Sequence, residues 1–395
     1  MTGVDFFSST ARGLFLRAGG LERGADEVPL SVENVPAGAV VLAEVVDVPA
    51  RCRVGNLEII EPAAGAADTW LTREVALIRG QKFVGAIGGR FANRSINGHA
   101  PARPAPPGRE LDLLNTGGVV GLSASADQAT VKLRVLGGVE LGGGPAGGGP
   151  TFVSDLTSIP ETAAPDEDDP APGTPLVLIA GSDMDVGKTT CAASLALSLR
   201  ASGIRVSYAK LTGTGRMRDL MKVSYGRPEG HFDSDRLGWD FVDAGLATTF
   251  EIGREEVRRQ ARRLLNHAAL RGEVIIAEIA DAPNAEGSIY VATDPWLQGW
   301  LQRFGLIVCA CDSVSSTLTA QWLRSQVGLG DEEILISGLV ANDPATREEV
   351  ELEIGLRTVS VSAPSQLSHH GGKTQGGAMA DWVIRHIMNL RKAMP

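Results

Sequence analysis

A short glycine-containing segment near the middle of the chain constrains its fold more than any other feature. It reads, in order, Gly181, Ser182, Asp183, Met184, Asp185, Val186, Gly187, Lys188, Thr189 and Thr190. An apolar run, Leu176–Ala180, precedes it, and a segment with helical periodicity, Thr189–Ser202, follows it. A glycine turn ending in Gly-Lys-Thr between a strand and a helix is typical of a phosphate-binding P-loop. The segment therefore predicts a nucleotide-binding α/β domain.

The residue types in this loop suit a nucleoside triphosphate. Gly187 permits a tight turn, so that loop N–H groups and the N-terminus of the following helix face the phosphates. Lys188 supplies positive charge to the β- and γ-phosphates, and the hydroxyl of Thr189 is a ligand for Mg²⁺. We therefore predict that the whole loop, from Gly181 to Thr190, binds ATP with Mg²⁺, and that Lys188 acts in catalysis.

The sequence around and after the loop alternates apolar runs with helical patterns. The predicted strands are Leu176–Ala180, Ile204–Ala209, Val274–Ile279, Leu306–Cys311 and Ile334–Val340. The predicted helices are Thr189–Ser202, Glu255–Leu270, Asp294–Arg303, Ser315–Val327 and one near Ala380–Arg391. Apolar runs without alternation are typical of strands covered on both faces. The pattern predicts a doubly wound, mostly parallel sheet in a domain spanning residues 175–395.

The N-terminal part, residues 1–141, has a different pattern. Its apolar runs are short and rich in β-branched residues: Ala39–Val48, Glu74–Ile78, Lys82–Ile87, Val119–Leu122 and Val131–Leu136. Glycine and proline separate these runs, which predicts an all-β domain, either a small barrel or a sandwich. Two glycine-dense segments, Gly85–Arg90 and Asn115–Gly121, precede no helical pattern. They predict tight β-turns rather than a dinucleotide-binding loop.

Residues 142–174 predict a linker between the two domains. Gly142–Pro150 is almost entirely glycine and proline, and Pro160–Pro175 is rich in proline, alanine and acidic residues. Neither segment can bury enough apolar surface to fold alone. Thr151–Ile159, which lies between them, is interpreted as a short strand or a tether.

The nucleotide-binding half resembles the dethiobiotin synthetase family. In the P-loop, Gly181 stands one residue before the usual first glycine, and acidic residues precede Val-Gly-Lys-Thr. Three further segments look like family motifs in the same order. They are Tyr208–Gly215, with Lys210, Thr214 and Gly215; Glu278 at a strand end; and Ser337–Asp343, with Asn342. The resemblance covers about residues 175–370 and none of the N-terminal domain.

The resemblance implies roles for several residues. Glu278 would bind Mg²⁺, Asn342 would recognise adenine, and Pro364 would lie in a loop that closes over the same base. Two departures concern the substrate side: Leu211 replaces the family's proline, and Ile279–Ala282 replaces its glycine-rich run. Those glycines would let the backbone approach a substrate closely. The resemblance therefore indicates a superfamily rather than a particular substrate.

Other polar residues are candidates for the metal and the acceptor. Asp240 is the predicted third Mg²⁺ ligand, from its position between the second strand and the arginine-rich helix; the alternative is a solvated turn acid. Lys210 is predicted to face the γ-phosphate and an anionic acceptor, and the alternative is a strand-end lysine that reaches solvent. Arg216 and Arg218, with Thr214 nearby, are candidate substrate ligands for a carboxylate. Their alternative is a solvated basic loop.

Composition limits the class of protein. The chain has 395 residues and a net charge of −10, so phosphate neutralisation along a nucleic acid is disfavoured as a function. No segment reaches the ~18 apolar residues that a membrane span needs. The four cysteines lack metal-binding spacing and are expected to be reduced thiols. We expect a cytoplasmic protein, a homodimer, without nucleic-acid or membrane partners.

Two functions remain open at this point. The first is an ATP-dependent ligase or kinase that phosphorylates a carboxylate or carbamate of a small molecule, for capture by a nitrogen nucleophile such as an amine. Lys188 and Lys210 would then stabilise charge on the transferred group. The second is a P-loop ATPase that acts as a nucleotide-dependent switch on a protein partner. Guanine specificity is disfavoured because no N-K-x-D sequence is present.

Overall fold

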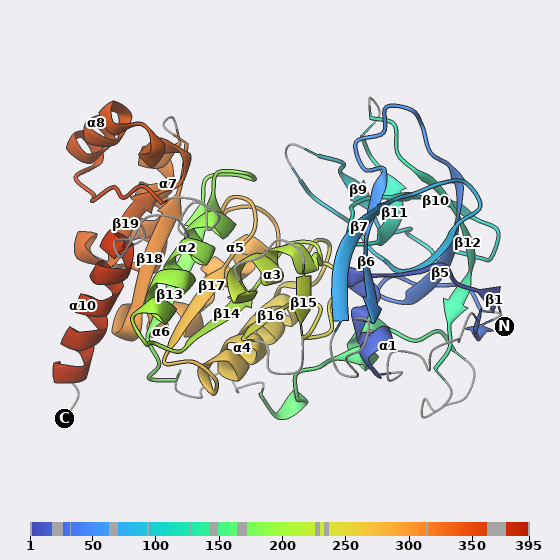
Figure 1. Ribbon diagram of the computed structural model, residues 1–395, viewed down its shortest axis with the longest axis horizontal. Coiled ribbons are helices and arrows are strands. Elements are labelled where there is room, and N and C mark those ends of the chain that lie inside the picture. Colours follow the sequence, from blue (N-terminus) through green and yellow to red (C-terminus); the bar gives the residue numbers. More distant parts are fainter. Residues whose placement is uncertain are drawn as a thin grey trace.

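The computed structural model describes residues 2–17, 27–31, 33–62, 70–92, 95–125, 128–141, 149–163, 172–225, 230–232, 237–312, 315–361 and 377–393. An N-terminal β-rich part and a C-terminal α/β part lie side by side (Figure 1). Several elements contact the other part.

A parallel sheet of six strands forms the centre of the C-terminal part. Its order is β16 (Gly238–Asp240), β14 (Val206–Lys210), β17 (Val274–Glu278), β13 (Leu176–Gly181), β18 (Gly305–Ala310) and β19 (Ile334–Ser337). Every residue of β13, β14 and β17 is buried, which explains why these segments show no polar alternation. Lys210 lies opposite both Glu278 and Asp240 in the register. The polar ends of these strands therefore meet at one edge of the sheet.

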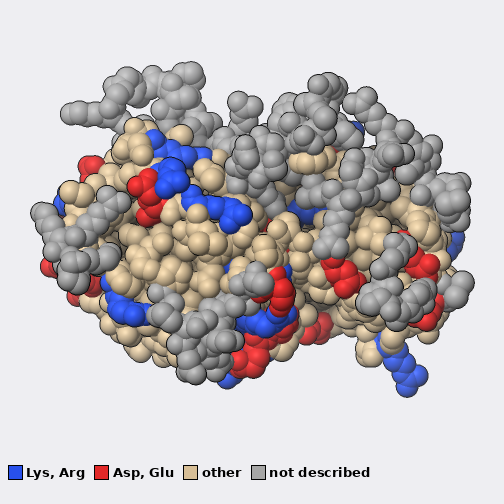
Figure 2. Space-filling view, turned by 90° about the horizontal axis from the view of Figure 1, so that it is seen from below, with Lys and Arg blue, Asp and Glu red and all other residues tan. Residues whose placement is uncertain are grey.

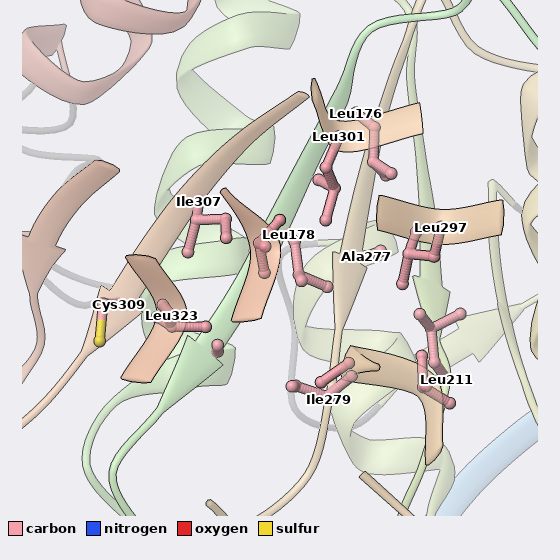
Figure 3. Close-up of a cluster of buried hydrophobic side chains, with 14 of the residues drawn as sticks. Leu176, Leu178, Leu211, Ala277, Ile279, Leu297, Leu301, Ile307, Cys309 and Leu323 are labelled. Atoms are coloured by element: carbon pink, nitrogen blue, oxygen red, sulfur yellow. The ribbon is translucent and has the colours of Figure 1, made fainter. Parts of the chain in front are cut away.

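Helices cover both faces of this sheet. Alternate residues of β13 point to opposite faces: Leu176 and Leu178 join one core, and Val177 and Ile179 join the other. The first core is shared with α4 (Arg254–Ala269), α5 (Ser288–Ala292), α6 (Pro295–Phe304), α7 (Ser316–Val327) and α8 (Pro344–Ile354). The second is shared with α2 (Lys188–Ala201), α3 (Met217–Tyr225) and α10 (Gly377–Ala393). Figure 3 shows the first core, where Leu297, Leu301 and Leu323 pack on the sheet.

The N-terminal part contains a small barrel. The strands β8 (Lys82–Ile87), β5 (Val40–Asp47), β12 (Lys132–Val139), β10 (Glu110–Leu113) and β11 (Val119–Ser123) pair in that order, and β11 pairs back with β8 to close the ring. The short strands β4 (Leu30–Ser31) and β9 (Gly98–His99) pair with its members. A separate pair joins β1 (Thr2–Gly3) to β3 (Glu27–Val28). Of the two predicted forms, barrel or sandwich, this closed ring is the barrel.

The sheet of the barrel extends towards the C-terminal part. β2 (Phe6–Ser8) pairs with β8 and is followed across the sheet by β6 (Asn56–Pro62) and β7 (Trp70–Ala76). The last strand is β15 (Gly230–Phe232), which belongs to the C-terminal half of the sequence and pairs antiparallel with β7. Figure 1 shows β15 beside β7 where the two parts meet. The two parts therefore share a sheet.

Part of the predicted linker is packed rather than free. The backbone of Thr151 hydrogen-bonds to Val40 and Val139 of the barrel. Residues Val153–Leu156 form the short helix η2, and Ile159 is buried in the first core of the C-terminal part. Arg263 of α4 donates to the carbonyl groups of Ile159 and Pro160. The glycine and acidic stretches at 142–148 and 164–171 lie outside the described residues.

None of the helices in the described ranges combines the length and apolar character needed to cross a membrane. On the face drawn in Figure 2, Lys and Arg side chains of the described residues are interspersed with Asp and Glu.

Candidate nucleotide-binding site

The P-loop connects β13 to α2 and is held in a tight turn. Gly187 has φ 104°, and a Cβ at this position would lie 3.3 Å from the Cα of Gly338. The N–H of Leu339 donates to the carbonyl of Val186 (3.2 Å), so the turn after β19 supports the loop. Asp185 also has a positive φ of 60°, a conformation that costs energy outside glycine. This geometry requires the glycine predicted at position 187.

Lys188 lies at the start of α2 with its side chain folded over the loop. Its Nζ donates to the carbonyl groups of Asp183 and of Asp281, the latter at 3.0 Å. Burial lowers the pKa of Lys188 from its usual value. The ammonium group is thus held by neutral carbonyls and has no direct carboxylate partner among the described residues. A phosphate oxygen would be a stronger partner for it.

Thr189 and Glu278 meet beside the loop. The hydroxyl of Thr189 donates to Oε1 of Glu278 (3.0 Å), and the hydroxyl of Tyr208 donates to Oε2 (2.9 Å). Burial raises the pKa of Asp281, which lies close by with φ 50°. Hydroxyl and carboxylate oxygens are ligands that Mg²⁺ prefers, together with phosphate oxygens and water. The donor set at this point therefore fits Mg²⁺ bound to a nucleotide.

Lys210 ends β14 on the other side of Glu278. Its Nζ forms an ion pair with Asp219 of α3 and lies 3.6 Å from Oε1 of Glu278. Burial alone would lower the pKa of Lys210, but the carboxylates of Asp219 and Glu278 hold it above the usual value. On α3, Lys222 donates to the hydroxyl of Thr190 (2.9 Å). Lys210 therefore stays charged and points into the site rather than to solvent.

These residues line one cleft with a volume of about 630 Å³. Its charged lining residues are six basic and four acidic, namely Arg90, Lys188, Lys210, Arg216, Arg218 and Lys222, and Asp185, Asp219, Glu278 and Asp281. The local excess of positive charge contrasts with the net charge of −10 of the whole chain. An anionic ligand matches this cleft.

The N-terminal part contributes to the same cleft. Arg90, Phe91 and Ala92 line it, although they follow β8 of the barrel. Sequence reasoning assigned Arg90 to a β-turn and assigned no role to Asp219, Lys222 or Asp281. The sequence signal for these residues is their spacing from predicted site residues. Asp219 and Lys222 follow Lys210 in the chain, on α3, and Asp281 follows Glu278 in the turn after β17.

Arg216, Arg218 and Thr214 also line the cleft, as the sequence analysis expects of substrate ligands. In this structure the two arginines contact carboxylates of the N-terminal part. Arg216 lies 3.1 Å from Glu74 and 3.7 Å from Glu58, and Arg218 lies 3.6 Å from Glu74. They join the two parts at the edge of the cleft, and their predicted role towards a substrate stays a prediction.

The predicted role of Asp240 as the third Mg²⁺ ligand is wrong. This residue is fully buried, does not line the cleft, and forms an ion pair with Arg12 of the N-terminal part. Arg12 also pairs with Asp243 at 2.9 Å. A carboxylate neutralised by a buried arginine is not available to a metal ion. The solvated-turn alternative is wrong as well, for the same reason.

Two residues, Asn342 and Pro364, are predicted to contact the adenine base, and the structure describes only the first. Asn342 is exposed at the end of the short helix η5 (Leu339–Asn342), which follows Gly338, the neighbour of the P-loop. It lies beyond the carboxyl end of β19, at the same edge of the sheet as the P-loop. Its role in adenine recognition stays a prediction. Pro364 lies outside the described residues.

A parallel sheet with a strand–P-loop–helix unit at its centre defines the class of P-loop nucleotide-binding folds. No known protein family matches the sequence, and no curated protein matches it. The solved structures that it resembles include a DUF1611 family protein from Anabaena variabilis, with 13% identity and a TM-score of 0.35 over 63% of this chain and 69% of that one.

Two further likenesses are of the same order. One is the LAO/AO transport system kinase, with 12% identity and a TM-score of 0.31 over 56% of this chain and 65% of that one. The other is the signal recognition particle 54 kDa protein from Aeropyrum pernix in complex with GDP, with 15% identity and a TM-score of 0.32. It is matched over 61% of this chain and 55% of that one. The chain thus spans less than two thirds of the length of these two proteins.

Proposed function

We propose that this protein is an ATP- and Mg²⁺-dependent enzyme that phosphorylates a carboxylate or carbamate of a small molecule, for capture by a nitrogen nucleophile. The observation that carries the proposal is the convergence of Lys188, Glu278 and Lys210 on one cleft. Lys188 belongs to the P-loop after β13, whereas Lys210 reaches the same space from the end of β14, which is separated from β13 by β17. A phosphoryl transfer between two anions needs positive charge on both sides of the transferred group.

Each of these residues would have a separate role in the phosphoryl transfer. The loop N–H groups and Lys188 hold the β- and γ-phosphates, and Lys210 draws the acceptor carboxylate towards the γ-phosphorus. A carboxylate oxygen attacks, the bond to the β–γ bridging oxygen breaks, and ADP leaves with that oxygen. Bound Mg²⁺, held through Thr189 and Glu278, would neutralise charge on the phosphate oxygens. An ionised carboxylate needs no strong base to become a nucleophile.

ATP is the proposed nucleotide because Asn342 can offer both a donor and an acceptor to adenine. This assignment rests on the resemblance to dethiobiotin synthetases and on the position of Asn342 after β19. The acceptor is proposed to be a small anionic molecule, since the cleft of about 630 Å³ must also hold the nucleotide phosphates.

A screen for ATP-to-ADP conversion tests the proposal. The purified full chain is incubated with Mg²⁺, ATP and small carboxylic or amino acids, and ADP is measured for each compound. We expect ADP to form in the presence of one class of acceptor and not in its absence. Lys188→Ala should abolish this turnover, whereas Lys82→Ala, in the barrel and outside the cleft, should retain it. ADP formation that is independent of every small acceptor contradicts a ligase or kinase.

A second candidate function is a nucleotide-dependent switch for a protein partner. One observation favours it: Arg216 and Arg218 line the cleft and also pair with Glu58 and Glu74 of the N-terminal part. A ligand that attracted these arginines would weaken the contact between the two parts. ATP hydrolysis stimulated by a protein, with no small acceptor required, would support this function over the first.

A further inference from the structure

The wall of the cleft that belongs to the N-terminal part is fixed in place by several contacts. Gly88 and Gly89, which follow β8, pack so closely on residues 248–251 that added Cβ atoms would meet Thr248 at 3.1 Å and Glu251 at 2.4 Å. Glu251 also accepts hydrogen bonds from His99 (2.6 Å) and from the N–H of Ala100 (3.0 Å). Arg90 follows these glycines directly and is therefore held at the cleft by both parts of the molecule.

Arg90 is a buried cation without a direct carboxylate partner among the described residues. The residue is 7% exposed, and its NH1 group donates to the carbonyl of Leu114 (2.5 Å). The other arginines of the cleft differ, because Arg216 and Arg218 have Glu58 or Glu74 within ion-pair distance. A buried charge that is not paired costs free energy, so its retention at a cleft points to a ligand that neutralises it.

Arg216 acts on Arg90 from the other part of the molecule. Both line the cleft, and burial together with the charge of Arg216 lowers the pKa of Arg90 to about 10. The charge of Asp281 raises the pKa of Arg90 and offsets this lowering only in part. Two guanidinium groups that repel each other across a cleft form a geometry that an anion stabilises.

We propose that Arg90 and Arg216 form an anion-binding subsite that takes a carboxylate or phosphate group of the acceptor, separate from the phosphate site of the P-loop. This proposal deepens the proposed function and rests on it, because the ligand of the subsite is the acceptor of the proposed reaction. Lys188 and the loop N–H groups already serve the nucleotide phosphates, whereas Arg90 comes from the N-terminal part. The acceptor therefore carries an anionic group in addition to the one that Lys210 positions for reaction.

The subsite can be tested by equilibrium binding, without turnover. The full chain is first saturated with Mg²⁺ and a non-hydrolysable ATP analogue, and then titrated with succinate or inorganic phosphate in a calorimeter. We expect Arg90→Met to weaken binding of these anions by ~10- to 100-fold, the usual effect of losing a charge-assisted contact. Arg90→Lys should show a smaller loss, because the charge remains but the planar fork does not.

Arg103→Met is the matched control. Arg103 is an exposed arginine of the same N-terminal part and does not line the cleft, so its loss should leave anion binding unchanged. Thermal unfolding checks that each variant folds. The midpoint of Arg90→Met should equal or exceed that of the wild type, because the substitution removes a charge that burial disfavours.

The outcomes separate this proposal from the proposed function. Wild-type protein that binds neither succinate nor phosphate at tens of millimolar overturns the subsite. Equal anion affinity in the wild type and Arg90→Met overturns it too. Loss of analogue binding in Arg90→Met, with anion binding intact, would assign Arg90 to the nucleotide instead. Failure of the wild type to bind the analogue contradicts the proposed function, whereas Arg90-dependent binding of succinate in that same protein would leave the subsite standing.

Discussion

Glu58 is a buried titratable residue at the contact between the two parts. Its side chain is 3% exposed; Oε1 accepts from the N–H of Arg218 (2.9 Å), and Oε2 lies 3.7 Å from Nε of Arg216. Burial raises the pKa of Glu58 to about 7, although the charge of Arg216 acts in the opposite direction. The ordinary value is 4.5. The folded chain therefore binds this proton more tightly than the unfolded chain does.

The stability that this proton contributes is fully present below the ordinary pKa of 4.5 and is lost as pH rises to about 7. Replacing Glu58 with Gln removes the titration and keeps the shape of the side chain. We predict that Glu58→Gln and wild type have similar free energies of unfolding at pH 5, and that the variant becomes more stable by roughly 1–3 kcal/mol at pH 8. Denaturant unfolding across this pH range measures the difference.

Glu110→Gln serves as the control for that series. Glu110 is exposed at the start of β10, so its substitution should leave a constant difference from wild type between pH 5 and pH 8. A difference between wild type and Glu58→Gln that does not grow with pH would mean that Glu58 is charged in the folded protein at neutral pH.

Individual site residues differ in how far the sequence could predict them. The P-loop residues are close in sequence and interact mainly with each other, so the order Gly187, Lys188, Thr189 is sufficient to predict a phosphate site. The prediction for Asp240 was wrong because its ion-pair partner, Arg12, is distant in the sequence and belongs to the other part. Arg90 was missed for the same reason, since its position at the cleft depends on Glu251 of the C-terminal part.

Among the secondary-structure elements, β14 positions Lys210, the residue that the proposed chemistry assigns to the acceptor. It ends at Lys210, and ligands of open α/β sheets gather at the carboxyl ends of the strands. We predict that Lys210→Met leaves ATP binding intact, because Lys188 and the loop N–H groups remain. Acceptor-dependent turnover should fall by an amount equivalent to ~2–4 kcal/mol of barrier, the usual loss for one preorganised charge.

Two measurements decide this prediction: nucleotide affinity by fluorescence titration, and turnover with the acceptor found in the screen. Lys82→Met is the matched control, because Lys82 begins β8 outside the cleft. Loss of ATP binding in Lys210→Met would assign the lysine to the nucleotide. Unchanged turnover would leave the alternative that the ion pair with Asp219 has a purely structural role.

Elements with a strong apolar pattern could be predicted from the sequence, whereas three elements with weaker patterns could not. The strands β13, β14, β17, β18 and β19 and the helices α2, α4, α6, α7 and α10 all overlap their predicted ranges. Their burial makes their patterns strong. By contrast, α3, β16 and α8 were not predicted. β16 has only three residues and α3 only nine, and the apolar residues of α8 are interrupted by Arg347, Glu348, Glu349, Glu351 and Glu353.

At the scale of the whole molecule, the two parts are joined more extensively than the glycine- and proline-rich composition of residues 142–174 suggests. The pairing of β15 with β7, the buried pair between Arg12 and Asp240, and the packed segment around Ile159 all cross the boundary. Composition reports only whether a segment can fold alone, so it could not predict that part of this one packs on its neighbours. The cleft is lined by both parts because of these contacts.

The central claim is that the cleft binds ATP with Mg²⁺ through the P-loop, and titration of the full chain with a fluorescent ATP analogue tests it most directly. We predict Mg²⁺-dependent binding that ATP displaces more effectively than GTP. Lys188→Ala should remove most of the affinity, and Thr189→Ala should weaken the dependence on Mg²⁺; Lys82→Ala, outside the cleft, should bind as the wild type does. A folded wild-type protein that binds neither nucleotide, or binds equally well after Lys188→Ala, would contradict the account.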